Sequence, residues 1–317
     1  MGRVIMKLQG SSFVALGILM IVHTHVYASC GSAACAINTQ WDQGIQHPGM
    51  AVDLRYEYIN QNQLREGSSK TQNGAGDALE KQTTNRNLIT TLDYTLDANW
   101  SFALSAPIVS RDHTHVLNDT QETESWNFSK LGDVLVTARY QPSAESFQNF
   151  QYGIKFGVKL PTGSTDIVNA EGVKAERALQ PGTGSSDTML GAFVHQTFPN
   201  TSGGWFVQAV WQHAITTYDN FTPGDRIAID LGLNYSLSDK WGALLQLNVL
   251  NKNRDTGTNA EPDLSGGKYV FVSPGLSYAL GPHSQVYGFI QKPVYQYVNG
   301  VQLTADLTAV IGVRHHF

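Results

Sequence analysis

The chain has 317 residues, 41 % of them hydrophobic, and carries a formal net charge of -5 at pH 7. This negative balance gives no electrostatic reason to expect nucleic acid as a partner. The length fits two soluble domains or one large β-barrel, so it does not decide the fold. The many Gly, Tyr, Phe, Asn, Gln and Thr residues favour β-structure.

The chain begins with a pattern typical of a secretory signal peptide. Arg3 and Lys7 precede a short apolar run from Phe13 to Val22, and we expect cleavage after Ala28. This run is shorter than the roughly 20 apolar residues that a transmembrane helix needs, and no later stretch reaches that length. We therefore predict that residues 1–28 are removed on export.

Residues 29–48 show no strand pattern, and we predict a periplasmic segment that precedes the barrel. It contains both cysteines of the chain, Cys30 and Cys35, as well as Trp41. In an oxidising periplasm the two thiols are expected to form a small disulfide loop. A lipid anchor on Cys30 is the alternative, although Tyr27 stands where a lipoprotein signal usually has Leu. A plug in the periplasmic mouth is a further hypothesis for this segment.

Between residues 49 and 317 apolar and polar residues alternate with period two, which predicts strands with one apolar and one polar face. In the first strand Met50, Val52 and Leu54 share one face, and Asp53 and Arg55 share the other. Twelve such segments are predicted, an even number of the kind that bacterial single-chain barrels have. They are residues 50–58, 88–96, 100–108, 134–140, 150–160, 190–194, 205–211, 227–237, 241–249, 270–280, 286–295 and 303–317.

The connections between these strands alternate in length. Asp97–Asn99 is one of the short ones, whereas Arg111–Lys130 and Thr162–Ser185 are long. Short periplasmic turns and long extracellular loops are expected of an outer-membrane barrel, and they place both termini in the periplasm. Pro274 and Pro293 each remove a ladder donor, so we expect a bulge or an early strand end near them.

The chain ends on Phe317, at the end of an alternating strand, as outer-membrane barrels do. We therefore expect the outer membrane as location, with its lipid and, through this strand, the barrel-assembly machinery as partners. Aromatic residues also gather beside the short turns, as in the girdles at membrane interfaces. The fold class predicted is an all-β transmembrane antiparallel barrel, because the alternative, a soluble sandwich, would not gather aromatics at one end. These residues are Tyr94, Trp100, Tyr140, Tyr152, Trp205, Tyr235, Trp241, Tyr278 and Phe317.

Charged residues on the polar faces are predicted to line the pore, because Arg or Lys facing lipid at the midplane costs about 2–4 kcal/mol. Both signs occur, so no strong ion selectivity is expected. Twelve strands enclose more room than a filled eight-stranded barrel and less than an open porin, which favours a narrow or gated channel. No cofactor is expected. The predicted pore-lining residues are Asp53, Arg55, Glu57, Asp93, Asp133, Arg139, Lys155, Lys159, Asp230, Asp306 and Arg314.

Three sequence blocks carry a resemblance to a known family. They are Gly157–Gly163, the strand opening Gly132-Asp133, and Val298–Thr304. With these blocks, residues 56–317 resemble the outer-membrane proteins of the MetA-pathway family of phenol degradation. The resemblance implies a transporter-like barrel for small organic solutes, aromatic ones among them. It supplies no binding residues. We expect no enzyme activity.

A lipid-acting enzyme is a second hypothesis, from another class. His213 has lipid-facing parity at one strand end, and Ser186 and Thr188 have the same parity on the strand before it. A base within hydrogen-bond reach of a hydroxyl would activate it as a nucleophile. No third, orienting group is evident in the sequence.

A metal-binding surface is a third hypothesis. His113 and His115 would point the same way in an extended loop, as a transition-metal pair requires. Glu122 and Glu124 lie in the same loop. A His-x-His pair in a polar loop is more often plain surface, so we predict no metal site from sequence.

Overall fold

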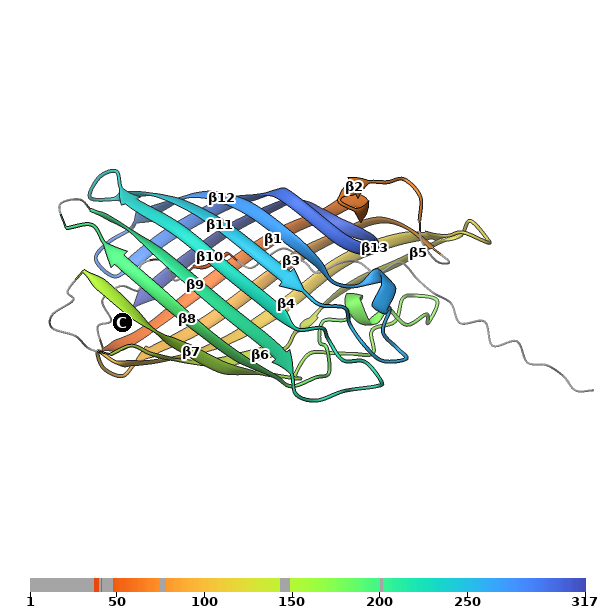
Figure 1. Ribbon diagram of the computed structural model, residues 1–317, viewed down its shortest axis with the longest axis horizontal. Coiled ribbons are helices and arrows are strands. Elements are labelled where there is room, and N and C mark those ends of the chain that lie inside the picture. Colours follow the sequence, from red (N-terminus) through yellow and green to blue (C-terminus); the bar gives the residue numbers. More distant parts are fainter. Residues whose placement is uncertain (1–36, 40, 42–47, 75–77, 143–148, 200–201) are drawn as a thin grey trace, which may run out of the picture.

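The computed structural model describes residues 37–39, 41, 48–74, 78–142, 149–199 and 202–317 (Figure 1). The expected signal peptide and the cysteines Cys30 and Cys35 lie outside these residues. Across the described residues, no helix has the length and apolar character that crossing a bilayer requires.

One antiparallel sheet contains all the described strands, and only two short 3-10 helices, η2 (Arg177–Leu179) and η3 (Pro262–Leu264), interrupt the connections. The strands are β1 (Gly49–Gly67), β2 (Ser69–Lys70), β3 (Ala78–Thr95), β4 (Trp100–Leu117), β5 (Thr123–Leu131), β6 (Val134–Tyr140), β7 (Phe150–Leu160), β8 (Asp187–Thr197), β9 (Gly203–Ala214), β10 (Arg226–Ser236), β11 (Trp241–Lys252), β12 (Gly267–Ala279) and β13 (Ser284–His316).

The sheet closes on itself because β13 pairs with β1 as well as with β12. Eleven strands form this ring, and β2 and β5 lie outside it. The long β13 folds back at Gly300, whose φ of 60° suits the turn. Its first arm pairs with β12 and its second arm with β1, and the backbone N–H of His316 donates to His283 across the hairpin. β13 therefore crosses the barrel wall twice, so the ring of eleven strands makes twelve crossings.

The two faces of each strand differ as the alternation predicts. Leu54, Leu104 and Leu245 are 41 %, 41 % and 46 % exposed on the outer face, whereas Asp53 and Asn248 are buried on the inner face. The apolar outer band suits lipid, and the closed ring leaves no sheet edge within it, as the absence of water in a bilayer requires. The predicted fold class, a transmembrane antiparallel barrel, is confirmed.

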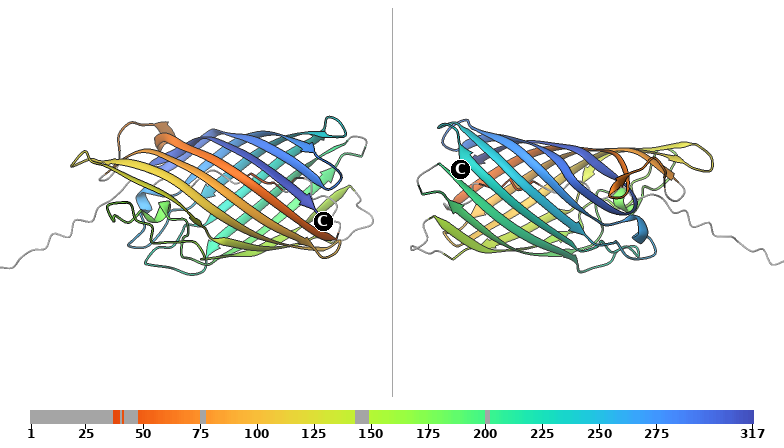
Figure 2. Two further views of the ribbon diagram at one scale, coloured as in Figure 1. Left: turned by 180° about the vertical axis from the view of Figure 1, so that it is seen from behind. Right: turned by 45° about the horizontal axis from the view of Figure 1, so that its top comes forward.

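One end of the barrel has short connections and the other end has long ones (Figures 1 and 2). Both Gly49 and Phe317 lie at the short-turn end, where the N–H of Phe317 donates to the carbonyl of Met50. Aromatic side chains meet at this rim, with ring centroids 4.8 Å apart in the pairs Trp100–Tyr140 and Trp241–Tyr278. This end corresponds to the predicted periplasmic rim.

The strands extend further at the opposite, long-loop end than the sequence predicts. The connection predicted at Arg111–Lys130 is wrong in part, because β4 continues to Leu117 and pairs there with β5. This β4–β5 hairpin projects beyond the rest of the barrel (Figure 1). The outer face of this extension carries polar residues such as Asp112 and Thr114, so the apolar alternation that marks lipid-facing strands is missing there.

The two strand prolines behave differently. β12 keeps its register through Pro274, which pairs opposite Leu245. At Pro293 the register shifts between Val270 and Phe271, which leaves Val294 as an extra residue. The predicted bulge therefore occurs at the second proline and not at the first.

We predict that arginine destabilises the barrel more at Leu247, on the wall, than at Leu280, on the rim. Leu247 pairs with Leu231 and Val272 on the lipid-facing side of β11. Arginine there should lower the free energy of unfolding by about 2–4 kcal/mol, and Leu280→Arg at the rim by about 0–1 kcal/mol. Equilibrium denaturation in lipid vesicles measures both, and equal losses would contradict the assigned membrane position.

Candidate functional site

The lumen contains a series of polar cavities that share walls. A chamber of about 300 Å³ lies toward the N-terminal segment, and an upper chamber of about 210 Å³ lies under the long loops. Gln212 and Arg226 line both chambers. A groove of about 640 Å³ adjoins the upper chamber and shares Pro223, Gly224 and Lys252 with it. The two chambers thus lie one above the other in the lumen, whereas the groove opens at the outer rim beside His213 and Tyr297.

Charged side chains that have ion-pair or hydrogen-bond partners line the lower chamber. Arg314 Nη2 lies 3.0 Å from Asp93 Oδ2, and the Tyr287 hydroxyl donates to both oxygens of Asp53 at 2.8 and 3.0 Å. Asn248 donates to Asp230 at 2.8 Å. Pairing of this kind compensates charges removed from water, so these groups stabilise a hydrated wall.

The upper chamber carries an excess of positive charge. Two carboxylates, Asp187 and Asp255, line it together with five cationic side chains. Asp255 pairs with Lys252 at 2.8 Å and Asp187 with Lys159 at 3.3 Å. Within the described part of the chain, Nε of Arg226 is buried without a hydrogen-bond partner. The five cations are Arg111, Lys159, Arg177, Arg226 and Lys252.

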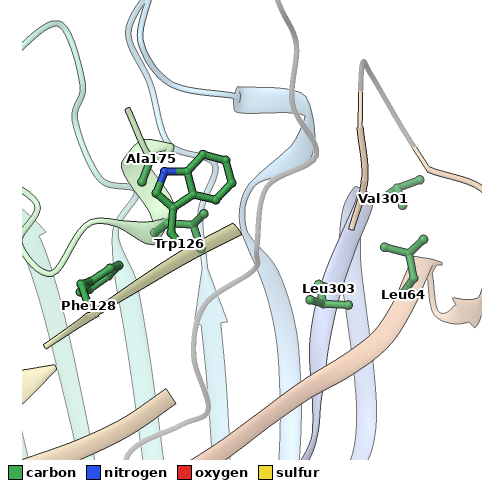
Figure 3. Close-up of a cluster of buried hydrophobic side chains, with 7 residues drawn as sticks. Leu64, Trp126, Phe128, Ala175, Val301 and Leu303 are labelled. Carbon is green, nitrogen blue, oxygen red and sulfur yellow. The ribbon is translucent and has the colours of Figure 1, made fainter. Parts of the chain in front are cut away.

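The roof of the upper chamber is the connection between β7 and β8, residues 161–186, which folds into the barrel. Leu179 and Ala175 of this connection are buried against Trp126 and Phe128 of β5, in a cluster that Leu64, Val301 and Leu303 complete (Figure 3). Trp126 Nε1 donates to the carbonyl of Val173 at 3.0 Å. The inward fold therefore has an apolar anchor of its own, which narrows the lumen at this level.

Buried charges clamp the same connection to the wall. Asp133 accepts hydrogen bonds from the backbone N–H groups of Gly163 and Thr183, both at 3.0 Å. Lys159 lies between Asp133, at 2.8 Å, and Asp187, at 3.3 Å. Gly163 and Gly182 pack so closely that a Cβ on Gly163 would stand 2.6 Å from Cα of Gly182. The glycines thus allow the two ends of the connection to meet.

Two arginines bond carbonyls of this roof, Arg111 from β4 and Arg177 from the connection itself. Arg111 donates to the carbonyls of Ala178 and Leu179 at 3.1 and 2.7 Å, and Arg177 donates to the carbonyl of Thr183 at 2.7 Å. Burial lowers the pKa of Arg177 below its usual value, which still leaves a guanidinium charged at neutral pH. Both side chains therefore present positive charge to the chamber.

The lower chamber ends at residues of the N-terminal segment. Trp41 packs edge-on against Tyr287 and Phe289, with ring centroids 5.0 and 5.6 Å apart. Ile37 is buried in the same cluster, and the Thr39 hydroxyl accepts from Arg55 Nη1 at 3.0 Å. These described residues of the segment occupy lumen space.

Eight of the eleven residues predicted to line the pore border a cavity, namely Asp53, Arg55, Asp93, Arg139, Lys155, Lys159, Asp230 and Arg314. Glu57 pairs with Arg55 at 3.0 Å, and Asp133 with Lys159. Asp306 sits where the register of β13 shifts, and it pairs with Lys292 at 3.6 Å. Its side chain is 38 % exposed, and it does not line the cavities that the other eight border. The role of these eleven residues in transport stays a prediction.

Sequence reasoning missed four cations of the upper chamber, namely Arg111, Arg177, Arg226 and Lys252. Arg226 shares the inward parity of Asp230 and could have been found by extending that strand by one residue. Arg111 shares the parity of Ser105, but the strand was expected to end before it. Lys252 shares the inward parity of Gln246 and Asn248, but the strand was expected to end at Val249.

The structure pairs Thr188 with His213 across β8 and β9, as the enzyme hypothesis requires. It also gives the His213 ring a carboxylate partner that the sequence did not show, because Nδ1 lies 2.7 Å from Asp225 Oδ1. The ring stacks on Trp211. The N–H of Ser186 donates to Thr216. The contacts of His213 thus join it to an exposed carboxylate on the rim.

The family model described as "Putative MetA-pathway of phenol degradation" matches residues 66–305. The chain belongs to this family. The resemblance predicted from the three sequence blocks is confirmed. No curated protein matches the chain.

Among solved structures, the COG4313 outer membrane channel from Pseudomonas putida F1 matches with a TM-score of 0.66 and 12 % identity, over 89 % of this chain and all of that one. The CymD monoaromatic hydrocarbon channel has a TM-score of 0.47 and 12 % identity, over 90 % and 94 % of the two chains. A FadL homologue from Pseudomonas aeruginosa has a TM-score of 0.44 and 9 % identity, over 85 % and 90 %. The likeness to the Pseudomonas putida channel establishes the fold as that of an outer-membrane barrel.

We predict that Lys159→Met releases the β7–β8 connection. Removing this cation leaves Asp133 and Asp187 buried without its charge, a change that costs about 3–5 kcal/mol. Hydrogen exchange of the Gly163 and Thr183 amides should accelerate.

Lys292→Met is the matched control, because its pair with Asp306 is exposed and worth no more than about 1 kcal/mol. Equal exchange rates in wild type and Lys159→Met would show that the clamp does not hold the connection.

Proposed function

We propose that this protein is a passive outer-membrane channel for small organic solutes, aromatic compounds among them, and not an enzyme. The two chambers in the lumen, which share Gln212 and Arg226 as lining residues, carry this proposal. Membership of a family described by phenol degradation and the likeness to an outer-membrane channel support it. The chambers are of single-ligand size, which favours selection of small solutes over free diffusion.

The preferred solutes are proposed to be anionic. Five cations and two carboxylates line the upper chamber, and rings of Arg or Lys favour anions in narrow pores. Arg226 stands at the junction of the two chambers, so every solute on this path passes it. An aromatic carboxylate combines the small size and the charge that this path would accept.

The N-terminal segment is proposed to act as a plug at the periplasmic end. Ile37 and Trp41 fill the lumen beside Phe206, Tyr287 and Phe289. Such a plug would keep conductance low at rest. Outer-membrane lipid around the barrel and the assembly machinery at the last strand are the proposed partners, since Phe317 is 76 % exposed at the rim.

We predict that Arg226→Gln lowers the preference for anions. Planar-bilayer recordings across a potassium chloride gradient measure the reversal potential, which should shift toward the potassium equilibrium value because the junction loses a positive charge. Block of the current by benzoate should weaken in parallel.

Arg86→Gln is the control for this variant, because Arg86 pairs with Asp112 and borders none of the described chambers. A folded barrel that conducts in no state, or an unchanged reversal potential in Arg226→Gln, would contradict the proposed path.

We predict that Trp41→Ala raises single-channel conductance. The substitution removes the ring that packs on Tyr287 and Phe289 and so opens space at the lower end of the lumen. Trp241→Ala at the outer rim is the control and should leave conductance unchanged. Equal conductance in wild type and Trp41→Ala would dispose of the plug while leaving the channel proposal intact.

A further inference from the structure

Two histidines and a glutamate converge inside the extracellular extension of the barrel. Register pairs Glu80 of β3 with His115 of β4, and His115 with Glu124 of β5, while Thr83 lies opposite His113. A bulge at Lys81 shifts the register between Glu80 and Gln82, which turns Glu80 to the same side as Thr83. Three adjacent strands therefore direct these groups to one point. The sequence-based expectation of an exposed loop pair is wrong, because both histidines are 1 % exposed.

The spacing of the three groups matches a metal site. His113 Nε2 lies 3.4 Å from His115 Nδ1 and 3.4 Å from Glu80 Oε2, and His115 Nδ1 lies 3.6 Å from Glu80 Oε1. One ligand atom from each residue fits within 4.8 Å of the others. Ligands at about 2.0–2.2 Å from a tetrahedral Zn²⁺ stand roughly 3.4 Å from one another. The two imidazole nitrogens are therefore spaced like two corners of such a tetrahedron, and each has one Glu80 oxygen at a similar distance.

Second partners fix the orientation of both rings. Nδ1 of His113 lies 2.8 Å from the Thr83 hydroxyl, and Nε2 of His115 lies 2.9 Å from Glu124 Oε2. A ring N–H donated to each of these oxygens leaves Nε2 of His113 and Nδ1 of His115 with lone pairs that face Glu80. Metal-binding histidines are held in this way, by a hydrogen bond from the other nitrogen to an oxygen.

The surroundings carry excess negative charge. A cavity of about 370 Å³ adjoins His115 and is lined by Glu124, Glu176 and Glu261. In the described residues both Glu176 oxygens are buried and have no hydrogen-bond partner. Burial raises the pKa of Glu176 well above its usual range, and the carboxylates of Glu80, Glu261 and Glu124 raise it further. A bound cation would compensate this accumulation of carboxylates.

The two cations that line the same cavity are directed elsewhere. Lys174 lies 3.6 Å from Asp219. Arg177 donates to the carbonyls of Thr165 and Thr183. Both cations of this cavity thus have partners other than Glu176.

We propose that Glu80, His113 and His115 form a binding site for a divalent transition-metal ion of the Zn²⁺ type, with Glu124 as a positioning residue and a water as the fourth ligand. Two imidazoles and one carboxylate are a ligand set that suits zinc. The ring centroid of Trp126 lies 5.6 Å from that of His113 and 5.1 Å from that of His115. Trp126 also anchors the inward-folded β7–β8 connection. The ion would thus link β3 to β4 in the extension, beside the roof of the pore.

Titration of the untagged, folded full chain in detergent with Zn²⁺ tests this site by calorimetry, with Co²⁺ absorption as the second measurement. We expect one ion per chain and a tetrahedral Co²⁺ spectrum without a thiolate band. His113→Ala and Glu80→Gln should each weaken binding by more than about a hundredfold, which exceeds the cost of losing an orienting partner. Glu124→Gln should weaken it by about ten- to a hundredfold.

His213→Ala is the matched control, because it removes an exposed histidine outside the cluster. Its Zn²⁺ affinity should equal that of wild type. If His113→Ala does not fold, Glu124→Gln and the Co²⁺ spectrum of wild type still decide the matter. Absent binding, binding that His113→Ala and Glu124→Gln leave unchanged, or a thiolate band from Cys30 and Cys35 would overturn the proposal.

Discussion

The rest of the structure depends on one constraint, which is that every backbone group inside the bilayer must find its partner within the protein. The pairing of β13 with β1 meets it, since this contact turns an open sheet into a ring. Once the ring is closed, alternation leaves each strand residue two directions, toward lipid or toward the lumen. The apolar band and the polar interior both follow from that choice.

The polar lumen adds a second constraint, which is electrostatic. Charges that cannot face lipid are gathered in a narrow space, and most of those near the periplasmic end are paired, as Asp93 is with Arg314. Higher up, the clamp of Asp133, Lys159 and Asp187 uses such pairs to hold the β7–β8 connection inside the barrel. Lys159 and Asp187 of the clamp also line the upper chamber, so the ion pairs that hold the connection lie at the level where positive charge is in excess.

The strands and their faces could be predicted from sequence because lipid imposes a strict period of two between residues 50 and 317. That signal fades above the membrane, where polar residues such as Asp112 and Thr114 replace the outer apolar ones, and the β4–β5 extension was therefore expected to be a loop. Contacts between distant segments leave no local pattern. The convergence of Glu80 with His115, and the packing of Leu179 on Trp126, depend on strand register and on a bulge that one sequence does not display.

Because of the bulge at Lys81, residue spacing as well as residue identity decides which side chains point into the β3–β5 extension. Loss of that one extra residue would reverse the direction of Glu80 while leaving every ligand-type side chain in the chain. A related barrel could thus keep both histidines and the glutamate and still have a different interior at this level. Insertions and deletions of a single residue are therefore a route by which barrels of this kind can change their interiors without exchanging any amino acid.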